Sequence, residues 1–175
     1  MNAPDPNLGR VFEIDVPLVM PPQPKRRSGK AVNRSYPPKL CPYNLNWKVH
    51  WRKHHEYKQT ITDGVTWRAK AARIPKAKFL TVQLHWAPGD NRSADTDNLA
   101  ASAKPAYDAL ARPTRKTTGA AWVGLQLVPD DSPQHMRKLE PVIHPGPQHT
   151  RRLWLTVQIG CTCCPGGDHH QEENT

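Results

Sequence analysis

The fold is decided by residues 79–110, which read FLTVQLHWAPGDNRSADTDNLAASAKPAYDAL. Within the first eight of these, residues 80–86 alternate between two sets of side chains, as expected for a β-strand with one buried face. The apolar set is Leu80, Val82, Leu84 and Trp86, and the other set is Thr81, Gln83 and His85. A turn is predicted at residues 87–90, and a helix is expected to begin just after Asp97, its N-cap, and to end near Ala111.

The predicted helix has two distinct faces. The face expected to lie in the core is formed by Leu99, Ala103, Ala106 and Leu110. The same spacing on another side of the helix collects Asp97, Ala101, Lys104 and Asp108. Lys104 therefore lies two turns after Asp97 on one side of the helix. Pro105 has no amide hydrogen to donate, so we expect it to kink this helix or split it in two.

Five further segments carry periodic patterns or apolar runs. Alternation predicts strands at 11–16, 136–143 and 153–159, and apolar residues at helical spacing predict a helix at 52–73. The apolar run 122–128 fits either a helix or a strand. Strands and helices in one short chain predict a small α/β (α+β) domain over residues 1–160, followed by a disordered tail at 161–175 that contains Cys and His.

Composition limits the partners of this domain. The chain has 175 residues, enough for one core, and 25 Lys and Arg against 15 Asp and Glu give it a formal net charge of +10. Such a balance favours polyanions as partners, because phosphates neutralised by the protein release their counterions. The sequence has neither an apolar run of about 20 residues nor a signal-peptide pattern, so we expect a cytoplasmic protein with no membrane partner.

Two stretches carry candidate nucleic-acid-binding residues. Residues 17–42 contain seven prolines and six Lys and Arg, which predicts an extended basic arm or loop inserted in the domain. This arm is either a solvated linker or a segment that tracks a DNA strand. Residues 44–53 interleave aromatic and basic side chains. The predicted DNA-binding residues are Lys25, Arg26, Arg27, Arg34, His50, Arg52, Lys53 and Arg92.

Four aspartates are the candidate metal ligands. Asp95 and Asp97 lie one residue apart before a helix, and Asp130-Asp131 follows some thirty residues later. An extended backbone lets Asp95 and Asp97 reach one cation, and Asp131, with Asp130 as the alternate, would supply a third oxygen ligand of the kind Mg²⁺ prefers. The alternative is that Asp95 and Asp97 are turn and cap residues. A calcium-binding EF-hand is excluded, because Leu99 and Ala100 stand where an oxygen ligand and glycine are required.

A carboxylate-bound metal in a basic protein suggests phosphodiester hydrolysis. The metal would activate a water for attack on the scissile phosphate, and Lys104 would stabilise the transition state. The alternative role for Lys104 is that of a solvated helix lysine paired with Asp108.

The order of these motifs resembles the RusA-like Holliday junction resolvases of bacteria and their phages. The resemblance covers residues 44–159 and comprises Asn46, His50, Trp51, Asp95-x-Asp97-Asn98-Leu99, Lys104, Asp108-Ala109-Leu110 and Asp130-Asp131. It implies a small mixed β-sheet with two main helices packed on it, and a homodimer that cuts four-way DNA junctions with Mg²⁺, or with Mn²⁺ as a substitute. The implied catalytic residues are Asp95, Asp97, Asp131 and Lys104. The family pattern puts the lysine four residues after the second aspartate, whereas here the step is seven residues.

Two functions from different classes are therefore expected. The first is a Mg²⁺-dependent, structure-selective endonuclease that resolves branched DNA in recombination and repair, in a bacterial or phage-infected cell and without a small-molecule cofactor. The second is a non-catalytic nucleic-acid-binding protein that uses the basic arm and residues 44–53. Substitution of Asp95 separates the two, because it should abolish cleavage by the endonuclease and leave the function of the binding protein untouched.

Overall fold

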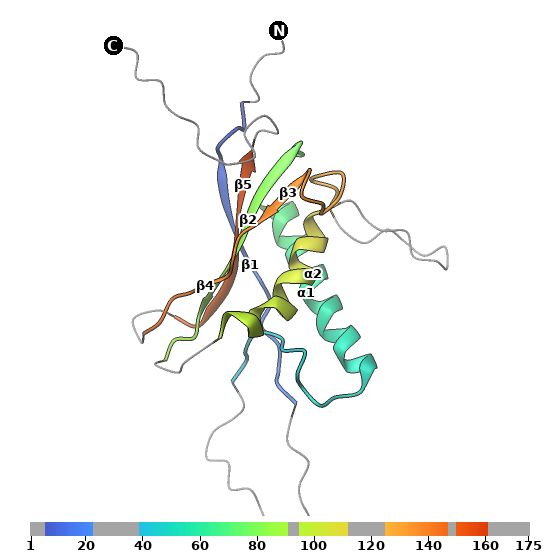
Figure 1. Ribbon diagram of the computed structural model, residues 1–175, viewed down its shortest axis with the longest axis vertical. Helices are drawn as coiled ribbons and strands as arrows, with labels where there is room; N and C mark the ends of the chain where they lie inside the picture. The colour runs from blue at the N-terminus through green and yellow to red at the C-terminus, as the bar shows by residue number, and fades with distance from the viewer. Residues whose placement is uncertain (1–5, 23–38, 91–94, 112–124, 147–149, 161–175) are drawn as a thin grey trace, which may run out of the picture.

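A five-stranded mixed sheet with two helices forms the described part of the chain (Figure 1). The computed structural model describes residues 6–22, 39–90, 95–111, 125–146 and 150–160. Its elements are β1 (Val11–Asp15), α1 (Trp51–Ala71), β2 (Phe79–Ala87), the 3-10 turn η1 (Thr96–Leu99), α2 (Ala100–Leu110), β3 (Met136–Lys138), β4 (Val142–Ile143) and β5 (Arg152–Gly160). The small α+β domain expected from the sequence is confirmed.

The sheet combines antiparallel and parallel pairs. β5 lies between β1 and β2 and is antiparallel to both, whereas β2 pairs in parallel with β3 and with β4. Leu84 lies opposite Leu155 and Val82 opposite Val157, so the buried faces of β2 and β5 coincide. The strand predicted at 79–86 therefore sets the register of its neighbours.

Both helices pack on the same face of this sheet (Figure 1). α1 buries Tyr57, Ile61, Val65 and Ala69, one residue per turn, as its apolar spacing predicted. The four residues predicted for the core face of the second helix are buried, Leu99 at the end of η1 and Ala103, Ala106 and Leu110 in α2. α2 is continuous through Pro105, so the expected split of this helix does not occur.

The segment 136–143 differs from its prediction as one strand. It forms two short strands, β3 and β4, that both pair with β2. Pro141 lies between them, and proline has no N–H with which to continue a ladder of hydrogen bonds. In the apolar run 122–128, residues 125–128 are described and belong to neither a helix nor a strand; Leu125 and Leu127 donate their amides to Ala109 and Leu110 at the end of α2.

The two ends of the predicted basic arm meet. Val19 and Cys41 exchange backbone hydrogen bonds of 2.9 and 3.0 Å, so the described residues on either side of this segment lie together. The predicted arm residues Lys25, Arg26, Arg27 and Arg34 lie outside the described residues, as do Arg92 and the tail 161–175. Within the described ranges, no helix is long and apolar enough to cross a membrane.

Candidate functional site

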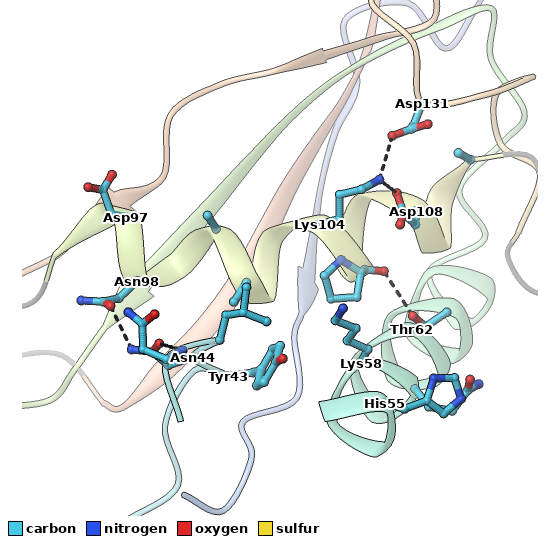
Figure 2. Close-up of a pocket in the computed structure, with 17 residues that line it drawn as sticks. Tyr43, Asn44, His55, Lys58, Thr62, Asp97, Asn98, Lys104, Asp108 and Asp131 are labelled. Atoms are coloured by element: carbon cyan, nitrogen blue, oxygen red, sulfur yellow. Dashed lines mark hydrogen bonds and ion pairs between the residues drawn. The ribbon is translucent and has the colours of Figure 1, made fainter. Parts of the chain in front are cut away.

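A groove of about 760 Å³ lies between α1, α2 and the loops that carry Asn44 and Asp131 (Figure 2). This volume falls within the usual range of ligand sites. Its polar and charged lining consists of Tyr43, Asn44, Asn46, His55, Lys58, Gln59, Thr62, Asp97, Asn98, Lys104, Asp108 and Asp131. Three of the four predicted catalytic residues, Asp97, Lys104 and Asp131, therefore line one groove.

The acidic motif forms the N-terminal end of η1, which leads into α2, and its cap lies two residues earlier than predicted. Asp95 has an extended backbone, and its carboxylate accepts a hydrogen bond of 3.1 Å from the amide of Asp97. Asp95 is therefore the N-cap, and the prediction of Asp97 as the cap is wrong. The reason is that the chain turns at Thr96 in a 3-10 turn, so the last extended residue is Asp95.

Lys104 lies in the middle of α2 and contacts two carboxylates. Its Nζ lies 2.7 Å from Oδ1 of Asp108 and 3.5 Å from Oδ2 of Asp131. The pKa of Lys104 is raised, mainly by the hydrogen bond to Asp108 and then by the charges of Asp108 and Asp131. The ammonium group therefore keeps its charge at neutral pH. The pairing with Asp108, the alternative role considered for Lys104, is present.

Asp131 is held by lysines from two elements. Lys138 of β3 lies 2.8 Å from the same Oδ2 that Lys104 approaches. The hydrogen bond from Lys138 is the main reason why the pKa of Asp131 is lowered. Asp130 instead accepts a hydrogen bond of 2.9 Å from the amide of Ser132 and does not line the groove. Hydrogen bonding by Ser132, first through its side chain and then through its amide, lowers the pKa of Asp130. Of the two adjacent aspartates, Asp131 is thus the one at the groove.

The three predicted metal ligands do not converge on one point. Asp95 borders a neighbouring cavity of about 350 Å³, while Asp97 and Asp131 lie toward opposite ends of α2 (Figure 2). Lys104 follows Asp97 by seven residues, which is about 10 Å along the helix. Lys104 contacts Asp131, so Asp131 lies near Lys104 and not near Asp97. Among the residues that the structure describes, no three His, Cys, Asp or Glu side chains are grouped so as to hold a metal ion. As arranged, Asp95, Asp97 and Asp131 do not form one three-carboxylate site for Mg²⁺ or Mn²⁺.

An asparagine pair closes one end of the groove. Nδ2 of Asn44 donates to Oδ1 of Asn98 over 2.9 Å, which ties the segment before α1 to η1. The Oγ of Ser102, buried in α2, adds a hydrogen bond of 3.1 Å to the carbonyl of Tyr43. The segment that carries Asn44 and Asn46 is thereby fixed against the acidic motif.

Sequence reasoning missed three residues of this site. Lys58 lies on the groove face of α1, where its spacing of three and four residues from His55 and Thr62 was a usable signal. Asn44 was included in an aromatic and basic stretch, but its contact with Asn98 is non-local. Lys138 was assigned to a strand, and its contact with Asp131 depends on how β3 pairs with β2.

Three predicted DNA-binding residues lie at the start of α1. His50 is the N-cap and accepts a hydrogen bond of 3.3 Å from the amide of Arg52. Lys53 pairs with Glu56 in the first turns of the helix. His50, Arg52 and Lys53 do not line the groove, but they stand on the same helix as His55 and Lys58, which do.

No model of a known protein family matches the chain, and no curated protein matches it.

Proposed function

We propose that this protein is a RusA-like, structure-selective endodeoxyribonuclease that resolves four-way and other branched DNA by paired cuts. One observation supports the proposal more than any other: Asp97, Lys104 and Asp131, predicted to act together, line one groove although Asp131 comes from a distant loop. The net charge of +10 favours a polyanionic substrate. The proposed protein is a cytoplasmic homodimer, because paired cuts require two symmetric sites.

The groove offers the groups that hold a nucleic-acid backbone. Lys58 is suited to contact a backbone phosphate, and the amide of Asn44 can donate to a phosphate oxygen. The charge of Lys104 would instead stabilise the transition state at the scissile phosphate. Asp97 and Asp131 are the proposed cleavage residues. Asp95 keeps its capping role in this proposal, since its carboxylate is engaged with the amide of Asp97.

Dependence on Mg²⁺, or on Mn²⁺ as a substitute, rests on the family resemblance alone. The described carboxylates are not grouped for a metal, and Asp131 already lies between two ammonium groups. A titration of cleavage rate with Mg²⁺, starting from metal-free protein in EDTA, tests this part separately from DNA binding.

A labelled four-way junction tests the proposed function directly. Wild-type protein with Mg²⁺ is expected to give paired nicks, and Asp97→Asn and Asp131→Asn are expected to bind the junction but not cut it. Glu13→Gln is the matched control, because Glu13 is an exposed acid on β1, away from the groove, where it pairs with Arg152. Intact strands at every metal concentration would contradict nuclease activity, and a monomer by light scattering would contradict paired cutting.

The second candidate is a non-catalytic nucleic-acid-binding protein. It is favoured by one observation, the engagement of Asp131 by both Lys104 and Lys138, which leaves its carboxylate neutralised without a metal. Tight junction binding without cleavage, unchanged or strengthened in Asp131→Asn, would support this candidate.

A further inference from the structure

Trp51, the first residue of α1, is 67% exposed. Tryptophan is usually largely buried, because its indole ring offers a large apolar surface to the core. A single exposed apolar side chain needs no functional explanation by itself. Whether Trp51 has a binding role is therefore judged from its position on the helix and from the charges around it.

The spacing along α1 places Trp51 on the helix face that borders the groove, although Trp51 is not itself a lining residue. Trp51, His55, Lys58 and Thr62 follow one another at intervals of four, three and four residues, so they share one face of the helix. His55, Lys58 and Thr62 line the groove. Trp51 therefore lies on this helix face one turn before the lining residues, where α1 begins.

The ring of Trp51 lies next to an imidazole and a guanidinium group. Its ring centroid lies 5.6 Å from that of His50, and the guanidinium carbon of Arg52 lies 5.5 Å from it. The first turn of α1 contains no acidic residue. The acid nearest in sequence, Glu56, is engaged with Lys53. An exposed aromatic ring next to the guanidinium of Arg52 suits a partner that carries both negative charge and flat rings.

We infer that Trp51 is a base-stacking residue that receives an unpaired base of a DNA strand whose backbone follows the groove. The inference rests on the proposed function in that it takes DNA as the substrate, and it adds which part of the DNA is recognised. Bases inside a duplex are already stacked on their neighbours, whereas unpaired bases at a branch point or in a single strand present free faces to an aromatic side chain. Arg52 beside the ring is placed to contact the adjoining phosphate.

Trp67 provides a matched comparison on the same helix. It is 69% exposed, nearly the same as Trp51. It follows Trp51 by 16 positions, which puts it about 160° round the helix, away from the face that carries the groove residues His55 and Lys58. Trp51→Ala and Trp67→Ala should therefore share any general effect of removing an exposed tryptophan from α1. Only Trp51→Ala should show an effect that depends on the helix face beside the groove.

The test measures the binding of two fluorescein-labelled probes by anisotropy, in EDTA and at fixed salt. One probe is a 20-nucleotide thymidine strand, and the other is a blunt duplex of 20 base pairs. Trp51→Ala is expected to weaken single-strand binding about tenfold, which corresponds to about 1.4 kcal/mol, and to change duplex binding far less. Trp51→Phe should retain most of the single-strand affinity, and Trp67→Ala should behave as wild type.

Intrinsic fluorescence gives a second readout of the same contact. The thymidine strand should quench tryptophan emission of the wild type and of Trp67→Ala more strongly than that of Trp51→Ala. Equal single-strand affinities for Trp51→Ala and wild type would overturn the inference, and so would an equal loss in Trp67→Ala. A change in oligomeric state in Trp51→Ala without a change in single-strand affinity would assign the residue to self-association and also overturn it.

Failure of this inference is distinguishable from failure of the proposed function. Single-strand binding that depends on Trp51, in a protein that cuts no junction, would remove the nuclease proposal and leave the stacking role. Junction cleavage, together with single-strand binding that Trp51→Ala does not affect, would support the nuclease proposal and remove the stacking role.

Discussion

The Nζ of Lys138 lies 2.8 Å from Oδ2 of Asp131, so a strand residue of the sheet holds a carboxylate at the edge of the groove. Lys104 approaches the same oxygen at 3.5 Å from α2. One carboxylate oxygen therefore links the sheet, the second helix and the loop after Pro129. The loop position that carries Asp131 is thereby fixed by charge as well as by backbone contacts.

Lys138→Met is expected to remove a pH-dependent part of the stability. The pKa of Asp131 is lowered in the folded protein, so the ionised carboxylate stabilises the fold above about pH 4, and this contribution is lost as the pH falls through the lowered pKa. Both side chains are 36% exposed, which limits the effect to about 1 kcal/mol or less at pH 7. Urea unfolding at pH 7 and at pH 3 measures it. A difference from wild type that is as large at pH 3 would contradict the assignment.

Lys104→Met is expected to slow junction cleavage by about tenfold or more at saturating protein, while junction affinity changes little, because its charge would be used in the transition state. The raised pKa of Lys104 keeps this group charged below about pH 10, so cleavage should show no loss from its deprotonation between pH 7 and pH 9. Single-turnover rates measure both effects. Lys78→Met is the control, since Lys78 is an exposed lysine next to β2 and does not line the groove. An equal slowing of cleavage in Lys104→Met and Lys78→Met would contradict a catalytic role for Lys104.

The fold was predictable because its signals are local. The alternation in 79–86 and the apolar spacing in 52–73 can each be recognised from a short stretch of sequence. The residues that these patterns predict to be buried are buried in β2 and α1. The break at Pro141 was not predicted, because the strand pattern on both sides of it is compatible with a single strand. The parallel pairing of β3 and β4 with β2 depends on the path of the chain between them and has no local signature.

The site was predictable only in part. The helical spacing placed Lys104 beside Asp108, and these two contact each other at 2.7 Å. The meeting of Asp131 with Lys104 involves residues 27 positions apart, and the sequence order alone suggested that Asp131 would join Asp95 and Asp97 instead. Which carboxylates meet depends on where the loop 129–132 crosses α2, and that is a property of the packed domain.

Lys58→Ala is expected to weaken DNA binding by a similar factor for every sequence tested, because it would contact phosphate rather than bases. Loss of one phosphate contact should reduce the slope of log affinity against log salt concentration by about 1. Anisotropy titrations between 50 and 200 mM salt, roughly the range over which such slopes are resolved, measure this change. Lys70→Ala is the control, about 18 Å farther along α1 and outside the groove. Equal slopes for Lys58→Ala and wild type would exclude the contact.

His85→Gln is expected to flatten the fall in stability between pH 7 and pH 5. Burial, and secondarily His144, lowers the pKa of His85, so its neutral form contributes stability that is complete above about pH 6.5 and declines as the pH falls toward the lowered pKa. The ring stacks on Trp154 at 5.1 Å and lies within 3.1 Å of Thr156 Oγ1, on the sheet face away from the helices. Urea unfolding across this pH range, with the exposed His55→Gln as control, tests the assignment. An unchanged pH slope in His85→Gln would refute it.

Gly64→Ala is expected to destabilise the protein, although alanine is the better helix former. The sequence alone treats Gly64 as a weak point of the helix, worth about 1 kcal/mol relative to alanine. The structure gives a reason for the glycine, because a Cβ at this position would overlap Cγ of Pro17, which leads out of β1. Overpacking of this kind costs about 1–3 kcal/mol, so the net loss of unfolding free energy should reach about 2 kcal/mol. Urea unfolding measures the loss, and the double variant Pro17→Ala/Gly64→Ala should recover much of it, because the obstructing ring is gone. A stabilised Gly64→Ala would show that Pro17 moves aside at little cost and that the glycine is not needed for packing.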